Sequence, residues 1–208
     1  MIIGISGAMG AGKSTLARFF VEWGGILVDA DRIGHAVIKR PQMRAALKAA
    51  FGDGIEGADG SLDRRELGRR AFADEAGKER LNKIVQPPLE VELWKQVERA
   101  NGPDYANIVV VDAALIFEWD RADRFDVVVV VFAAEQVQIE RVAQRQNLER
   151  AEIRERLAAQ MPAAEKISRA DFALENNGSV RQLEEKAARL WAKLADGWSH
   201  SEARRKIQ

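Results

Sequence analysis

Residues 7–14 read Gly-Ala-Met-Gly-Ala-Gly-Lys-Ser, and this stretch decides the fold class of the chain. It matches the pattern G-x-x-x-x-G-K-[ST] of the phosphate-binding P-loop. A run typical of a strand, residues 2–6, precedes it, and a run typical of a helix, residues 14–21, follows it. The alternative, a glycine-rich turn that happens to precede Lys-Ser, does not explain this strand–loop–helix context. The chain is therefore predicted to bind a nucleoside triphosphate.

The residues of this loop have distinct predicted tasks. Glycines let the backbone approach an anion closely, and the backbone amides then form a nest for phosphate oxygens. Lys13 is predicted to reach the β- and γ-phosphates, Ser14 to ligate Mg²⁺ through its hydroxyl, and Thr15 to lie within reach of the α-phosphate. The predicted ATP-binding residues of this segment are Gly7, Gly10, Ala11, Gly12, Lys13, Ser14 and Thr15.

Composition narrows the class of protein. The 208 residues fit one domain, predicted to span residues 1–208, with 32 Lys and Arg against 32 Asp and Glu. This balance argues against a non-specific nucleic-acid binder, and the absence of cysteine excludes disulfides and thiolate metal sites. The chain opens on a predicted strand rather than a signal peptide, and no apolar run reaches about 18 residues. We expect a cytoplasmic monomer or weak homo-oligomer without a nucleic-acid or membrane partner.

Strand-like and helix-like segments alternate, which predicts a parallel sheet with helices on both faces. We expect a three-layer α/β/α P-loop NTPase fold with a five-stranded parallel sheet. Its core is predicted to comprise about residues 1–31, 106–133 and 170–196. The predicted strands are residues 2–6, 26–29, 107–112, 126–132 and 171–175. Five consecutive valines in the fourth strand suit a strand that is buried on both faces.

The long segment 32–105 between the second and third strands is predicted to be mostly helical. It is either an inserted region that covers the substrate or a set of extra helices packed on the sheet. A second helical segment, about residues 134–169, is predicted to form a lid. The individual helices expected are residues 62–73, 78–85, a helix opened by Pro87-Pro88, 135–146, 150–161 and 180–195. The polar tail 199–208 is predicted to fray.

Acidic residues follow the predicted second and third strands, at the sheet edge where doubly wound folds gather their chemistry. Asp31 is a candidate to orient and deprotonate an acceptor hydroxyl, and Asp29 is a candidate to cap the next helix. The alternative is that both only cap that helix. Asp112 resembles a Walker-B acid that holds the Mg²⁺ shell, with a strand-terminal turn as its alternative. GTPases recognise their base with an Asn/Thr-Lys-x-Asp motif. The nearest string in this chain, residues 82–85, begins with Asn-Lys but does not end in an acid, so this motif is missing. Together these features favour a small-molecule kinase.

The sequence resembles the dephospho-CoA kinase family over nearly the whole chain, to about residue 194. The P-loop ending, Gly10 to Thr15, and Asp29-Ala30-Asp31 correspond to the opening of the family. Asp59-Gly60-Ser61-Leu62-Asp63-Arg64-Arg65-Glu66-Leu67 and Leu81-Asn82-Lys83-Ile84-Val85-Gln86-Pro87 match more specific blocks, as does Asp112 to Glu118. Later correspondences are Arg141, Arg145, Gln160, Ala170-Asp171 and Asn176-Asn177-Gly178.

The resemblance implies transfer of the γ-phosphoryl group of ATP to the ribose 3′-hydroxyl of 3′-dephospho-CoA, giving ADP and CoA. It implies catalytic roles for Asp31, Lys13 and Arg141, and Mg²⁺ binding at Ser14 and Asp112. It further implies ATP binding by Arg145, Asn176 and Gly178. It implies substrate binding by Asp31, Arg64, Phe72, Gln86, Leu115 and Glu118. Alternatives are a solvated basic face for the two late arginines, a plain turn at 176–178 and simple exposure of Glu118.

Two departures concern the acceptor side. The family histidine before proline is Gln86 here, and an amide donates a hydrogen bond but carries no charge. The usual proline is Ala114, which predicts a less rigid turn. They leave open a kinase for another small hydroxylated acceptor, such as a nucleoside, a nucleotide or a sugar acid. A non-catalytic ATP-binding regulatory protein is the alternative from a different class; the combination of Asp31, Lys13 and Ser14 disfavours it.

Overall fold

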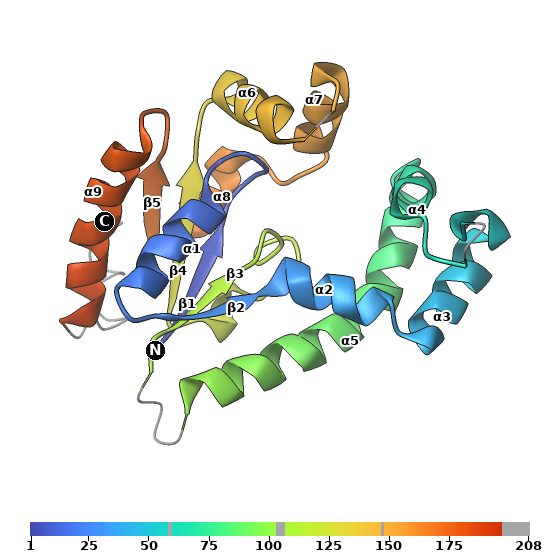
Figure 1. Ribbon diagram of the computed structural model, residues 1–208, viewed down its shortest axis with the longest axis horizontal. Coiled ribbons are helices and arrows are strands. Elements are labelled where there is room, and N and C mark those ends of the chain that lie inside the picture. The colour runs from blue at the N-terminus through green and yellow to red at the C-terminus, as the bar shows by residue number, and fades with distance from the viewer. Residues whose placement is uncertain (58–59, 103–106, 147, 197–208) are drawn as a thin grey trace. The chain divides into compact units, whose positions relative to one another are not determined.

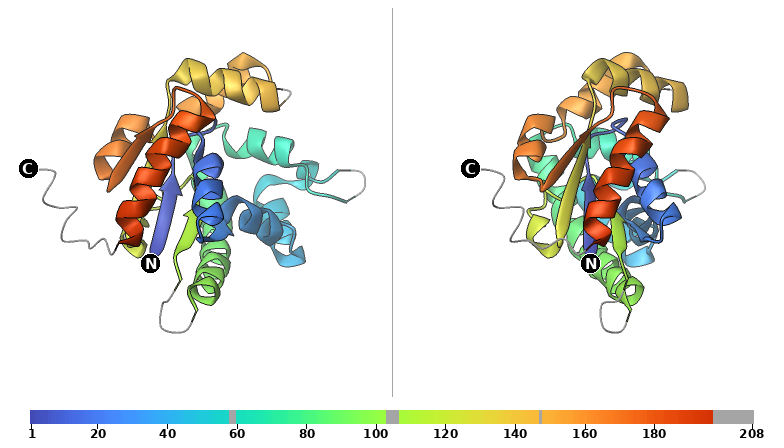
Figure 2. Two further views of the ribbon diagram at one scale, coloured as in Figure 1. Left: turned by 60° about the vertical axis from the view of Figure 1, so that its left-hand side comes forward. Right: turned by 90° about the vertical axis from the view of Figure 1, so that its left-hand side faces the viewer.

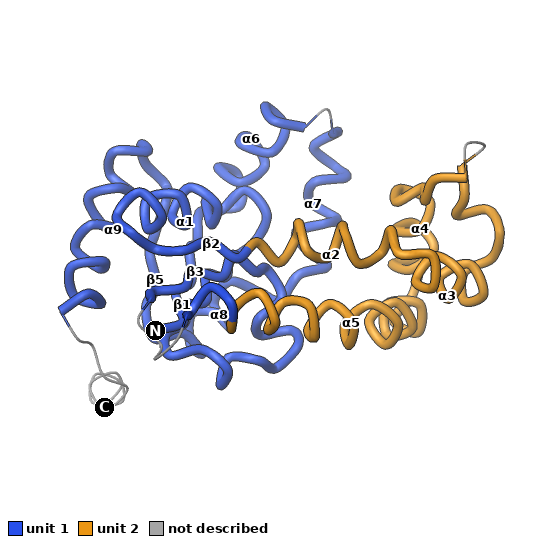
Figure 3. Tube along the Cα trace, turned by 60° about the horizontal axis from the view of Figure 1, so that its bottom comes forward, with its two compact units in different colours: residues 1–28, 99–208 blue, residues 29–98 orange. Residues whose placement is uncertain are grey.

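The computed structural model describes residues 1–57, 60–102, 107–146 and 148–196. The chain forms two compact units, residues 1–28 with 99–208 and residues 29–98, which Figure 3 colours separately. The second unit overlaps the segment 32–105 that was predicted as an insertion, and the substrate-covering role of that segment stays a prediction. The polar tail predicted to fray lies outside the described residues.

The first unit contains the predicted sheet. Its strands are β1 (Ile2–Ser6), β2 (Ile26–Asp29), β3 (Val109–Asp112), β4 (Val127–Phe132) and β5 (Phe172–Glu175). They are ordered β2-β3-β1-β4-β5, and the pairs β1/β3, β1/β4 and β4/β5 are parallel. The five predicted strands are confirmed: the first two have the predicted bounds, and the last three start one or two residues later than predicted. In this order β1 is central, so the loop that follows it emerges between β3 and β4.

Helices cover both faces of this sheet, which confirms the three-layer fold. The helices are α1 (Lys13–Glu22), α6 (Glu135–Arg145), α7 (Arg150–Ala158), α8 (Ala163–Arg169) and α9 (Val180–Ala195), with a short 3-10 helix, η3 (Ala122–Arg124). Figures 1 and 2 show α1 and α9 side by side. Their apolar faces bury Ile3, Ile5, Val127 and Val129 of the sheet. On the other face, Gly4 leaves space that Ile116 and Phe125 fill.

The second unit is helical and has its own small core. Its elements are α2 (Ala30–Ile38), α3 (Pro41–Phe51), the 3-10 helix η1 (Asp53–Ile55), α4 (Arg64–Ala71) and α5 (Glu75–Asn101), whose last residues continue into the first unit. The core of this unit consists of Leu47, Phe51, Ile55, Leu67 and Ala71. None of the described helices is long and apolar enough to cross a membrane.

Two helix predictions need correction, and one helix was missed. Pro87-Pro88 does not open a new helix but lies inside the continuous α5, whose ribbon changes direction midway in Figure 1. Proline lacks an amide hydrogen and clashes with the preceding turn, so it bends a helix that other contacts keep intact. The helix predicted from residue 62 begins at Arg64, because Leu62 pairs with Glu56 in a β-bridge and Asp63 caps the helix. Helix α8 was not predicted.

Candidate active site

The P-loop connects β1 to α1 through backbone angles that favour glycine. Gly7, Gly10 and Gly12 have φ values of 147°, 77° and 110°. A Cβ on Gly7 would lie 2.1 Å from the carbonyl oxygen of Val131. Helix α1 begins at Lys13 without a side-chain cap, so its first amides are left for an anion. The loop therefore has the geometry that a phosphate-binding nest requires, with Ala11 buried at its base.

Ser14 and Asp112 meet beside this loop, although 98 positions separate them in the sequence. The Ser14 hydroxyl donates a 2.7 Å hydrogen bond to Oδ2 of Asp112. The contact follows from sheet register, because Asp112 pairs with Ile5 at the carboxyl end of neighbouring strands. A hydroxyl and a carboxylate at this distance are hard oxygen donors of the kind that Mg²⁺ prefers. The structure thus brings together the two residues predicted to hold the metal.

The two aspartates after β2 have different environments. Asp29 is the N-cap of α2, and its Oδ1 accepts a 2.9 Å hydrogen bond from the amide of Arg32. The capping alternative is therefore confirmed for Asp29. Asp31 lies exposed in the first turn of α2, where its carboxylate does not cap the helix. Its role as a base stays a prediction.

The side chain of Arg141 in α6 is hydrogen-bonded to the loop after β5. Its guanidinium donates to the main-chain oxygens of Asn176, at 2.8 Å, and Gly178, at 3.0 Å. Burial, and secondarily the charge of Arg145, hold the pKa of Arg141 below its usual value. Arg145, one turn further along, is exposed. Arg141 thus fixes the 176–178 loop, while the predicted phosphate contacts of both arginines stay predictions.

Asn176 is buried and contacts the P-loop directly. Its side-chain amide nitrogen donates a 2.8 Å hydrogen bond to the carbonyl of Ala11. A Cβ on Gly12 would come within 2.2 Å of the same nitrogen. The neighbouring Asn177 accepts from the amide of Ala134 through its Oδ1, at 2.7 Å. The loop at 176–178 is therefore a support of the phosphate nest rather than a plain turn.

The loop after β3 contains Leu115 and Glu118, both partly buried. Glu118 is not simply exposed, since Oε1 lies 2.7 Å from Nζ of Lys166 and accepts from the amide of Met161 at 3.3 Å. Sequence reasoning missed Lys166, which is 1% exposed in α8. No local pattern singles out one lysine among the charged residues of this segment. The substrate-binding roles of Leu115 and Glu118 stay predictions.

Gln160, one of the residues that carry the family resemblance, makes a contact that was not predicted for the site. Its Oε1 accepts a 3.1 Å hydrogen bond from the amide of Met9 in the P-loop. Met9 also packs against Ile139, Val142 and Ile153 of α6 and α7. The predicted lid segment therefore contacts the nest in this structure.

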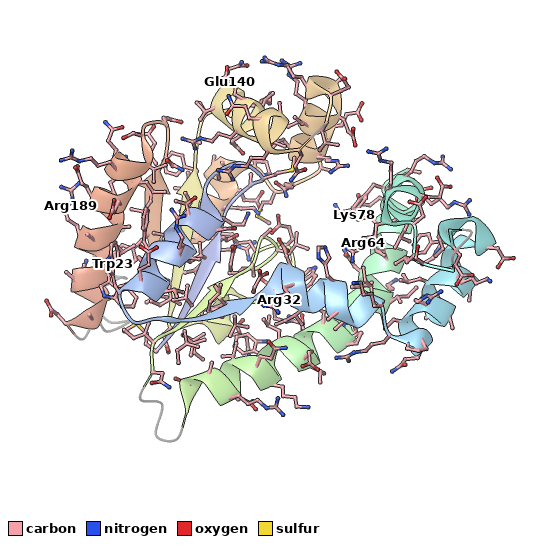
Figure 4. All side chains as sticks on the ribbon, in the orientation of Figure 1. Trp23, Arg32, Arg64, Lys78, Glu140 and Arg189 are labelled. Atoms are coloured by element: carbon pink, nitrogen blue, oxygen red, sulfur yellow. The ribbon has the colours of Figure 1, made fainter. Side chains whose placement is uncertain are left out.

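The remaining predicted substrate residues belong to the second unit. Arg64 opens α4, is exposed and is labelled in Figure 4; Phe72, at the other end of α4, is 59% exposed. Gln86 lies in α5, where its Nε2 donates a 2.7 Å hydrogen bond to Oε1 of Glu90. Asp59 of the matched block lies outside the described residues. The substrate-binding roles of Arg64, Phe72 and Gln86 stay predictions.

Comparisons with known proteins show which family this chain resembles. The family model described as dephospho-CoA kinase matches residues 1–182. The dephospho-CoA kinase of Geobacter sulfurreducens is 38% identical over 92% of this chain and 98% of its own length. That of Corynebacterium jeikeium is 37% identical over 92% of this chain and 98% of its own.

Solved structures share the fold. The Thermus thermophilus protein TT1252 superposes with a TM-score of 0.78 at 33% identity, covering 96% of this chain and 98% of its own. The dephospho-CoA kinase of Campylobacter jejuni has a TM-score of 0.69 at 20% identity, covering 94% of this chain and 98% of its own. The second likeness concerns the fold alone.

Proposed function

The chain belongs to the dephospho-CoA kinase family, whose members are ATP-dependent kinases, and we propose the roles of its residues from that premise. The observation that carries the proposal is the 2.7 Å contact between Ser14 and Asp112 beside the glycine nest. It joins a phosphate-binding loop to an acidic group at the carboxyl edge of one sheet. A triphosphate bound there has its reactive end next to a pair of metal-binding oxygens.

The donor half of the reaction depends on the P-loop. The amides of the nest and the start of α1 bind the phosphates of ATP, and Lys13 offsets charge on the β- and γ-phosphates. Ser14 and Asp112 fit a Mg²⁺ ion, which takes few protein ligands and completes its shell with water and phosphate oxygens. Bound there, the ion would neutralise charge that develops on the transferring phosphoryl group. These residues hold the ATP while the acceptor attacks.

The acceptor half depends on Asp31. The 3′-hydroxyl oxygen of dephospho-CoA forms a bond to the γ-phosphorus of ATP. At the same time the bond between that phosphorus and the oxygen that bridges the β- and γ-phosphates breaks. ADP leaves with the electrons of the broken bond, and the hydroxyl proton passes to the Asp31 carboxylate. Asp31 is suited because it lies in the first turn of α2, two residues after the end of β2, and is not used as the cap of α2. Arg64 and Phe72 are proposed to bind the acceptor's phosphate and adenine groups.

The test of this function is an acceptor-dependent ADP assay with the purified chain, ATP and Mg²⁺. Dephospho-CoA should release ADP in a one-to-one ratio with CoA, identified by its mass. Shikimate, gluconate and a nucleoside serve as other hydroxylated acceptors. Turnover of one of these alcohols, with none above background for dephospho-CoA, would reject the acceptor assignment. ADP release that no acceptor increases would instead favour an ATP-binding switch.

The role of Asp31 can be tested against a matched control two residues away. Asp31→Asn should lower kcat by about 10²–10⁴-fold, because the amide cannot accept the proton, while ATP affinity changes little. Asp29→Asn should keep near-normal turnover, since asparagine also caps a helix. Steady-state rates and titration with a fluorescent ATP analogue measure both quantities. A normal rate in Asp31→Asn would remove it as the base.

A further inference from the structure

Lys166 is a buried charge that the proposed reaction does not use. Its side chain is 1% exposed, and its Nζ lies 2.7 Å from Oε1 of Glu118 and 2.9 Å from the carbonyl oxygen of Ala114. A buried ammonium is costly unless it is paired and hydrogen-bonded. Both partners belong to the loop after β3, so the ammonium is anchored to that loop.

The same loop begins at the proposed metal residue. Asp112 accepts from Ser14, and the carbonyl of Ala114 also accepts a 3.2 Å hydrogen bond from Oγ of Ser6, the last residue of β1. The loop is thus held at Asp112 and Ala114 from the P-loop side. Lys166 adds the contact from α8 and is bound at both Ala114 and Glu118.

Because of Glu118, the 112–118 loop is expected to move when the Lys166 ammonium is removed. Its Oε1 accepts from Lys166 and from the amide of Met161, while its Oε2 is buried with no hydrogen-bond partner among the described residues. Without the ammonium, a carboxylate with one unpartnered oxygen would have to move toward water. The segment that would move starts at Asp112.

We propose that Lys166 is a positioning residue for phosphoryl transfer, which holds the 112–118 loop so that Asp112 stays aligned with Ser14. The inference rests on the proposed metal role of Asp112. A purely stabilising role is the poorer explanation, because buried ion pairs are often no better than apolar side chains of similar volume. What such a pair does supply is a defined arrangement of the loop that carries it.

The first experiment measures metal-dependent nucleotide binding and needs no turnover. A non-hydrolysable ATP analogue is titrated with and without Mg²⁺ against wild type, Lys166→Met and Lys166→Arg. The increase in affinity that Mg²⁺ causes in wild type should fall by about tenfold in Lys166→Met, as for groups that orient a metal ligand, and should return in part in Lys166→Arg. Affinity without Mg²⁺ should change little. Lys186→Met is the control, since Lys186 also donates to a main-chain carbonyl, that of Glu175 at 2.7 Å, but through an exposed hydrogen bond away from the 112–118 loop.

The second experiment separates positioning from folding. Lys166→Met should lower kcat more than it raises KM for ATP, and should lower the urea midpoint. In the double variant Lys166→Met/Glu118→Gln the unpaired buried charge is gone, so the midpoint should recover while the Mg²⁺ response of analogue binding stays low. The Mg²⁺ response is the readout in this variant, because Glu118 is itself a predicted substrate-binding residue and its loss could lower kcat. Folded Lys166→Met with a wild-type Mg²⁺ response would overturn the proposal. Recovery of the Mg²⁺ response together with the midpoint in the double variant would overturn it too.

The two proposals can fail separately. A wild-type chain that transfers no phosphate to dephospho-CoA contradicts the acceptor assignment. The Mg²⁺ response of analogue binding still decides the role of Lys166 in that case.

Discussion

Replacing Gly12 with alanine tests the packing of the phosphate nest. The new Cβ would lie 2.2 Å from Nδ2 of Asn176, which is buried and donates to Ala11. Alanine at a φ of 110° also strains the backbone by about 1–2 kcal/mol. Displacing the Asn176 amide leaves buried polar groups unpaired, at about 1–3 kcal/mol. Gly12→Ala should therefore reduce the free energy of unfolding by about 2–5 kcal/mol.

Gly24 provides a matched control in the same unit. Its φ of 109° is nearly the same, but a Cβ there would meet no atom within 4 Å. Gly24→Ala should show the backbone strain alone, about 1–2 kcal/mol. Any loss of unfolded-state entropy on going from glycine to alanine is shared by both variants. The difference between them, about 1–3 kcal/mol, isolates the contact with Asn176.

Urea denaturation followed by tryptophan fluorescence measures this difference. Trp23 and Trp191 pack together at 6.3 Å between ring centroids, so they report on α1 and α9 of this unit. Titration with an ATP analogue should show weaker binding in Gly12→Ala than in Gly24→Ala. If Gly12→Ala is no less stable than Gly24→Ala, Asn176 does not pack against the P-loop backbone at Gly12. That result would contradict the role of Asn176 in holding the glycine nest.

Two further predictions concern the second unit. The side chains of Arg69 and Arg70 lower the pKa of Glu66 from 4.5 to about 2, so its stabilising contribution is complete above about pH 4.5 and is lost as the pH falls towards 2. Glu66→Gln should lower the urea midpoint near neutral pH and flatten its pH dependence in that window; an unchanged pH profile would contradict the assignment. Asp29→Ala removes the cap on the Arg32 amide and should destabilise the chain by about 1 kcal/mol, measured by urea denaturation, whereas equal loss in Asp29→Asn would contradict capping.

The donor half of the site could be predicted because its information is local. The P-loop, the strand before it and the helix after it occupy adjacent residues. The pattern of apolar residues predicts the strand and the helix, and the glycine spacing predicts the loop between them. Asp112 could be predicted from its place at the end of an apolar run. Ser14 and Asp112 were both predicted to hold the metal, but their direct hydrogen bond required the fold, since sheet register brings the two residues together.

The contacts that support the site could not be predicted, because they depend on tertiary packing. The sequence predicts a less rigid turn at Ala114, yet two side chains hydrogen-bond its carbonyl in the structure. Arg141 was predicted from the resemblance to act on phosphates, and the structure shows its bonds to Asn176 and Gly178. The intrinsic preference of proline predicts a helix start at Pro87, but in the structure Pro87 lies inside the continuous helix α5, so tertiary context overrides that preference.

The glycine nest needs such supports for a physical reason. Positive φ values at Gly7, Gly10 and Gly12 are accessible to glycine but are not enforced by it, so an isolated loop would sample many conformations. Among the described residues, distant side chains hydrogen-bond the P-loop motif: Gln160 at Met9, Asn176 at Ala11 and Asp112 at Ser14. Ordering the loop before ATP arrives reduces the entropy lost on binding. The motif supplies the conformational freedom, and residues far along the chain hold the loop in one conformation.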